Sequence, residues 1–196
     1  MKTMLCAALA VTTLAIPAAA SAQKAPAAVI VVVDNGRIYD ECTACKAAVT
    51  QLQAQAANLQ AQQAALAAPL RAEAQSIQTA GAALKGAPPS AALQARVTAL
   101  QAKEATANTQ LQRLQQNLQS SQQNVRRQID ARLGPIISQV MTAKGANIAV
   151  DTDATLARSP SLDVTNEVLA ALNTQVPAVS VTPLPAAAQG ATPQGR

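Results

Sequence analysis

The sequence predicts a mostly α-helical protein, in which a long antiparallel coiled-coil helical hairpin carries a small β-strand body at its base and assembles by oligomerisation. Two observations predict the hairpin: larger apolar residues recur in a heptad pattern along two segments, and a Gly/Pro break separates those segments. Composition gives the third observation. The chain has one Tyr, no Phe and no Trp, and its 49% hydrophobic content is largely alanine, which favours helices but buries little area.

Residues 1–22 have the pattern of a secretory signal peptide. Lys2 precedes an apolar run, 4–16, and the small residues 20–22 form a cleavage pattern before Gln23. The run is too short to span a bilayer, and no later stretch supplies about 20 uninterrupted apolar residues. We therefore expect an exported protein whose mature chain begins at Gln23.

The range 46–144 is predicted to form the hairpin arm. Its first helix carries its larger apolar residues at Val49, Leu52, Leu59, Leu66, Leu70, Ile77 and Leu84. Its second helix carries them at Leu93, Val97, Leu100, Leu111, Leu114, Leu118 and Val125. Polar residues fall in the remaining core positions, among them Gln63, Glu73 and Glu104, so we expect a loosely packed, mobile arm.

The tip of the hairpin is expected near residues 86–90. Gly86 suits the left-handed position that ends a helix, and the two following prolines forbid helix continuation. Ser90 then offers an N-cap for the second helix. So short a connection predicts that the two helices run antiparallel.

Residues 23–45 and 145–176 are predicted to form the small β/α oligomerisation body. Val29–Val33 is a β-branched run typical of a buried strand, and 147–150 is a second strand candidate. A third strand is expected over 154–158.

Asp163 is expected to cap a last helix, and the Pro/Ala-rich range 177–196 is expected to be a disordered tail. So few strands and one short helix offer too little apolar surface for independent stability, which predicts self-association of the body.

Charge is segregated along the chain. The arm carries ten basic and three acidic residues, whereas the rest of the mature chain has an acidic excess. A positive arm attracts acidic polypeptides or anionic lipid headgroups, although the same charges also serve simply to solvate a helix. Without stacking aromatic residues, and with export, nucleic acid is not an expected partner. The candidate client-binding residues are Arg71, Lys85, Arg96, Lys103 and Arg113.

Cys42 and Cys45 form a Cys-Thr-Ala-Cys motif at the start of the arm. Three interpretations stay open: a disulfide within the first helical turn, an intersubunit contact, or a thiol-redox function. Two cysteines without histidine are a poor metal site. The absence of histidine, of a Gly-rich phosphate loop and of a carboxylate pair also argues against an enzyme and against a cofactor.

The order of these segments resembles the Skp/OmpH family of periplasmic chaperones. The local matches are the strand-to-helix entry over 31–39, the return over 145–151 and the closing helix over 163–169. The resemblance implies a periplasmic homotrimer with a barrel-like body, whose three arms hold unfolded outer-membrane proteins without ATP. The Cys42/Cys45 pair and the Pro/Ala-rich tail depart from the family pattern, and no lipopolysaccharide-binding motif can be recognised.

An alternative hypothesis is a structural coiled coil that acts as a spacer or scaffold of the cell envelope. It rests on the long heptads, and it predicts a stable partner and no general affinity for unfolded chains. A third hypothesis, a thiol oxidoreductase, rests on Cys42 and Cys45 alone.

Overall fold

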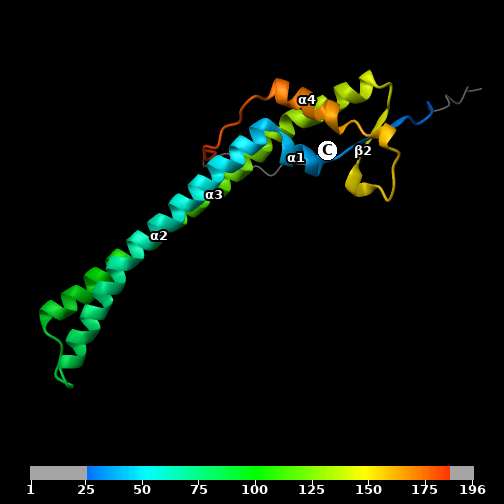
Figure 1. Ribbon diagram of the computed structural model, residues 1–196. Coiled ribbons are helices and arrows are strands. Elements are labelled where there is room, and N and C mark those ends of the chain that lie inside the picture. The colour runs from blue at the N-terminus through cyan, green and yellow to red at the C-terminus, as the bar shows by residue number, and fades with distance from the viewer. Residues whose placement is uncertain (1–25, 186–196) are drawn as a thin grey trace, which may run out of the picture.

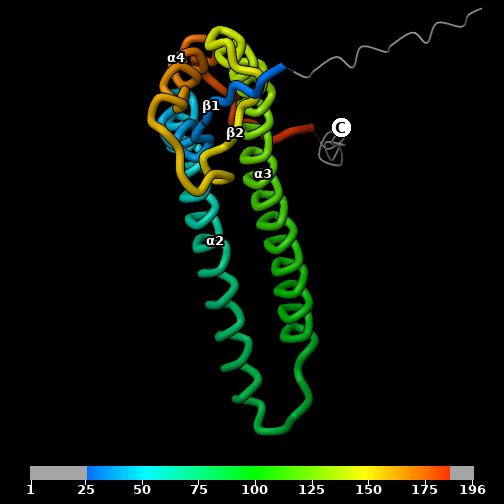
Figure 2. Tube along the Cα trace, turned by 90° about the vertical axis from the view of Figure 1, so that its right-hand side faces the viewer, coloured from blue at the N-terminus to red at the C-terminus, as the bar shows by residue number. Residues whose placement is uncertain are grey.

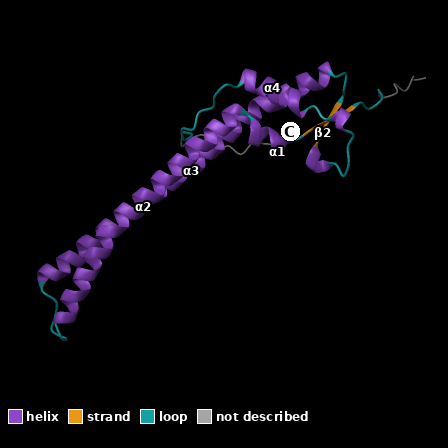
Figure 3. Cartoon of the chain, in the orientation of Figure 1, coloured by secondary structure: helices purple, strands orange, loops and turns teal. Residues whose placement is uncertain are grey.

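The computed structural model describes residues 26–185, and the predicted signal peptide lies outside that range. A long helical hairpin projects from a small body (Figures 1 and 3). The body contains a two-stranded sheet. The elements in chain order are β1 (Ile30–Val33), α1 (Asn35–Glu41), α2 (Thr43–Ala83), α3 (Ala91–Ala143), β2 (Ile148–Asp151), the 3₁₀ turns η1 (Thr152–Ala154) and η2 (Pro160–Leu162), and α4 (Thr165–Gln175).

The predicted antiparallel hairpin is confirmed, with α2 and α3 lying side by side and joined at the tip (Figure 2). The Ser90 hydroxyl caps α3 by accepting a hydrogen bond from the Leu93 amide at 3.2 Å, as expected. Lys85 and Gly86 both have positive φ, 46° and 94°, so the left-handed turn extends over two residues. The turn therefore reverses the chain within a few residues.

The seam between α2 and α3 is formed mainly by half-buried leucines, and Ala107 alone is buried among residues 50–118. A two-helix ribbon has only one buried side, which explains why no leucine between residues 50 and 118 is fully covered. Val49 and Val97, predicted in the seam, are instead 51% and 36% exposed. At the start of α2 the body fixes the buried face through Ala44 and Ala48, which turns Val49 outward.

The sheet joins two strands that lie far apart in the sequence. β1 pairs with β2 in parallel, with Val32 opposite Val150 and Val33 opposite Asp151. The third strand predicted over 154–158 is wrong, because η1 and a loop occupy this part of the chain. Besides its pairing with β2, β1 forms a single bridge between Val32 and Asp163. The Asp151 carboxylate causes the turn by accepting a hydrogen bond from the Asp153 amide at 3.1 Å.

The hydrophobic core lies in the body, between α1, the base of the hairpin and α4. Its largest fully buried apolar side chains are Ile38, Ile129, Ile136, Val168 and Leu172. Burial of each such side chain contributes on the order of 2 kcal/mol. The body therefore anchors the hairpin, because α1 and α4 pack against the same end of α3.

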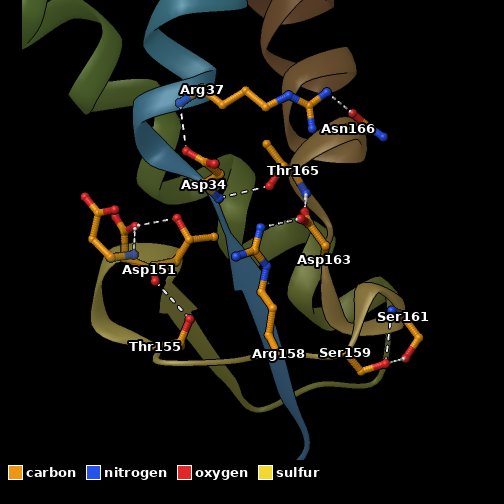
Figure 4. Close-up of polar contacts among 12 residues, drawn as sticks. Asp34, Arg37, Asp151, Thr155, Arg158, Ser159, Ser161, Asp163, Thr165 and Asn166 are labelled. Atoms are coloured by element: carbon orange, nitrogen blue, oxygen red, sulfur yellow. Dashed lines mark hydrogen bonds and ion pairs between the residues drawn. The ribbon is translucent and has the colours of Figure 1, made fainter.

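Polar contacts tie β1 and α1 to the entry of α4 (Figure 4). The Asp34 amide donates to Oγ1 of the buried Thr165 at 2.9 Å, and Asp34 Oδ1 accepts from the Arg37 amide at 2.8 Å. α4 begins at Thr165, and its N-cap is Val164, which makes no side-chain cap hydrogen bond, so the predicted N-cap at Asp163 is wrong by one residue. Asp163 instead accepts a hydrogen bond from the Thr165 amide at 2.9 Å. Arg158 reaches the other oxygen of Asp163 at 3.2 Å. The β1–α1 corner is thereby fixed to the start of α4.

Of the range 177–196 predicted as a disordered tail, residues 177–185 contain no helix or strand, and residues 186–196 lie outside the described range. We call residues 177–185 the strap. It leaves α4 and runs back along the hairpin, drawn from orange to red in Figure 1. Val179 and Val181 pack against the core, so apolar contacts hold this segment despite its Pro/Ala-rich composition.

Candidate client-binding hairpin

The basic side chains of the arm are distributed over both helices and the tip. Arg71 lies on α2, Lys85 in the tip turn, and Lys103 and Arg113 on α3, and all four are exposed. The structure does not gather them into one patch. Distributed, solvated cations favour many weak contacts over a single recognition site.

Arg96 differs from the other candidates because it bridges the two helices. Its Nε donates to Glu73 Oε1 at 3.0 Å and its Nη2 donates to Ser76 Oγ at 2.8 Å. The hydrogen bond that Arg96 donates to Glu73 is the main reason that the pKa of Glu73 lies below its usual value. Arg96 therefore joins α2 to α3 near the tip, a role that the charge count did not predict.

Lys103 lines an open cavity between α2 and α3 together with Glu73, and its positive charge is a smaller cause of the lowered pKa of Glu73. The cavity has a volume of about 410 Å³, and Pro69 of α2 forms part of its wall. Leu66, Leu70 and Ala107 supply further apolar lining. Pro69 lies inside α2, where a proline removes one backbone hydrogen bond of the helix.

Cys42 and Cys45 form a disulfide with each other, in agreement with the first of the three interpretations of the motif. Cys42 separates α1 from α2, and its Sγ accepts a hydrogen bond from the Cys45 amide at 3.0 Å. Both cysteines are buried, at 1% and 3% exposure. The disulfide therefore fixes the bend through which the body holds the arm.

Tyr39 of α1 forms a junction with α3 that the sequence did not predict. Tyr39 donates to Asp130 of α3, and the Arg126 guanidinium lies 5.8 Å from the centre of the Tyr39 ring. Burial, and next the hydrogen bond to Asp130, raise the pKa of Tyr39 to about 12. The spacing of Arg126 and Asp130, four residues apart on one helix face, was the available signal.

Within residues 26–185, no helix combines the length and apolar character that a membrane crossing requires. The same described range holds no group of three or more His, Cys, Asp or Glu side chains arranged for a metal ion. The described residues thus form a long hairpin with exposed cations and half-buried leucines, and the small core of the body anchors one end of it.

The fold and this surface define a protein with a helical-hairpin arm on a small α/β base. A family model described as outer membrane protein (OmpH-like) matches residues 29–172, and the chain belongs to this OmpH-like family. The match begins next to β1 and ends within α4, so the strap lies beyond it.

The fold is similar to that of a crystal structure from Caulobacter crescentus, described as a candidate outer membrane chaperone (OmpH-like). The TM-score is 0.67 at 21% sequence identity, and the alignment covers 80% of this chain and 90% of the other. The comparison with curated proteins gives no match.

Proposed function

We propose that this protein is an ATP-independent holding chaperone of the periplasm, which binds unfolded outer-membrane proteins and prevents their aggregation. The observation that carries the proposal is the arm, whose exposed cations Arg71, Lys85, Lys103 and Arg113 lie on a hairpin with incompletely buried apolar seams. Membership of the OmpH-like family supports the same function. Weak contacts over a large surface hold a client without turnover, which requires no nucleotide.

We further propose that three copies assemble through the body. Ile30 of β1 and Ile148 of β2 are paired in register, and each is 41% exposed. Val29 and Leu162 add exposed apolar area nearby in the chain, at 46% and 37%. A two-stranded sheet with exposed isoleucines is marginal alone, so burial against further copies supplies the missing stabilisation. Three arms would then surround one client.

The direct test is to dilute urea-unfolded porin into buffer with and without the mature protein and to follow turbidity. We expect suppression of aggregation at low salt and weaker suppression as salt screens the basic arms. Unchanged turbidity at severalfold molar excess would contradict the proposal.

Light scattering gives the second test, because a mass of three chains is expected. Ile30→Thr with Ile148→Thr should shift the mass toward one chain. A stable dimer with no affinity for unfolded porin would instead favour an envelope spacer. Binding to anionic lipid vesicles, measured separately, tests whether the arm also meets lipid headgroups.

A further inference from the structure

The strap shows how an extended polypeptide lies on this hairpin. Five of its hydrogen bonds join strap main-chain atoms to side chains of α2 and α3. Gln55 donates to the Val181 carbonyl and Asn124 to the Thr182 carbonyl, each at 3.0 Å. Because amide side chains contact backbone groups that every residue possesses, this part of the contact is independent of sequence.

Two residues of α3 complete the contact with the strap. Gln128 both donates to the Ser180 carbonyl at 2.9 Å and accepts from the Ser180 amide at 3.0 Å. Ser120 accepts from the Leu184 amide at 2.8 Å. The hairpin therefore pairs with strap backbone on both its donor and its acceptor atoms, as a neighbouring strand does.

The side chains of the strap alternate. Val179 and Val181 are half-buried and pack against the core, whereas Ser180 and Thr182 between and after them are exposed. An extended chain presents alternate residues to opposite sides, so one side of the strap faces the hairpin and the other faces solvent. The site thus accommodates an extended segment in which apolar and polar residues alternate.

The same face of the hairpin continues beyond the strap. A groove of about 450 Å³ begins at Pro183 of the strap and is lined by Gln55, Asn58 and Asn117, with Leu59, Leu114 and Leu118 as its apolar wall. Asn117 lies seven residues before Asn124, which places both on one side of α3. The groove therefore repeats the combination of amide and apolar groups that already holds the strap.

We propose that this face of the hairpin, from Gln128 to Asn117 on α3 and along Gln55 and Asn58 on α2, binds extended client segments with alternating apolar residues. The strap occupies the part of the face nearest the body. Transmembrane β-strands have this alternation, and an unfolded outer-membrane protein contains many of them. The inference rests on the proposed function and assigns its client site to amide side chains in addition to the cations.

The test uses removal of the tethered strap, which competes with clients at a high effective concentration. Chains ending at Val176 and at Pro185 are compared with the full chain, so that loss of the strap is separated from loss of 186–196. The dissociation constant for fluorescent, urea-unfolded porin is measured by anisotropy, with reduced, carboxymethylated lactalbumin as a non-barrel probe. Circular dichroism checks that each variant keeps its helices.

We expect the chain ending at Val176 to bind porin about fivefold more tightly than the full chain, with little gain for lactalbumin. In that shortened chain, Asn117→Ala and Asn124→Ala should each weaken porin binding about threefold. Gln119→Ala is the matched control, because Gln119 is exposed and two residues beyond Asn117, on the opposite side of α3.

Several results would overturn the inference: unchanged or weaker porin binding after removal of the strap, the same gain in the chain ending at Pro185, equal gains for both probes, or equal effects of Asn117→Ala and Gln119→Ala. Failure of the proposed function is distinguishable, since porin would then bind to neither the full nor the shortened chain.

Discussion

Arg96 of α3 and Glu73 of α2 form an ion pair across the hairpin, with 3.0 Å between Nε and Oε1. Both side chains are partly exposed, at 41% and 35%, so this pair adds little to stability. Its larger effect is on charge, because Glu73 engages a cation that the arm would otherwise present to a client.

Neutralising that carboxylate therefore releases Arg96. We expect Glu73→Gln to tighten the binding of unfolded porin about twofold to threefold at low salt, and Arg96→Gln in the same chain to cancel the gain. Glu104→Gln is the control, since it removes the charge of an exposed carboxylate on α3 without freeing Arg96. Equal gains from Glu73→Gln and Glu104→Gln would show that only net charge matters.

The exposed cations of the arm give a second prediction. Replacing Arg71, Lys103 and Arg113 together by Gln should weaken porin binding about tenfold at low salt and have little effect near 0.5 M salt, because screening removes the attraction. Arg132→Gln changes an exposed cation of α3 that lies toward the body and should leave binding nearly unchanged. Anisotropy titrations across a salt series measure the effect.

Acid should destabilise the body through Asp163. Hydrogen bonds from the Thr165 hydroxyl and amide, and then the Arg158 guanidinium, hold the pKa of Asp163 below its usual value. A carboxyl group whose pKa is lowered by folding stabilises the protein above its unfolded pKa, and this stability is lost as the pH falls through the folded value.

We therefore expect the Tm to fall as the pH drops below about 4, and this fall to be smaller in Asp163→Asn. Glu167 shares the pattern, because a hydrogen bond from Lys144 lowers its pKa, so Glu167→Gln should also reduce the acid sensitivity. Thermal melts from pH 2 to pH 7 provide the comparison. An unchanged pH profile in both variants would exclude these carboxylates as the cause.

Loss of the disulfide should lower stability without creating or removing an enzymatic activity. Closing so short a loop contributes about 2 kcal/mol on chain-entropy grounds. We expect Cys45→Ala to lower the free energy of unfolding by that order, as measured in urea, and dithiothreitol to have no further effect on this variant. Since both cysteines are buried, the wild-type chain is expected not to accelerate insulin reduction.

The hairpin could be predicted because each of its signals is local. Heptad spacing, the Gly/Pro break and the Ser90 cap lie within a few residues of the structure that they specify. The strap could not be predicted in this way. Its conformation depends on Gln55 and Asn124, which lie more than 50 residues away, and no periodicity in a Pro/Ala-rich segment indicates such partners.

The same reasoning explains the remaining errors. Val49 continues the heptad pattern, but contacts of Ala44 and Ala48 with the body decide which face of α2 is buried. The range 154–158 lacks a partner strand, because Asp163 already occupies the bridge to Val32. Among the candidate site residues, Arg96 joins α2 to α3, and this role could not be predicted because it depends on the distance between Arg96 and Glu73 in the folded hairpin.

The parallel pairing of β1 with β2 sets the order in which this molecule can be completed. Ile30 is synthesised early, yet its partner Ile148 follows only after the whole hairpin, and Leu172 of the core comes later still. Until then the valine-rich β1 has no strand to pair with, and such segments are prone to aggregate. The newly made chain is thus itself an unfolded polypeptide at risk, in the same situation as the clients proposed for it.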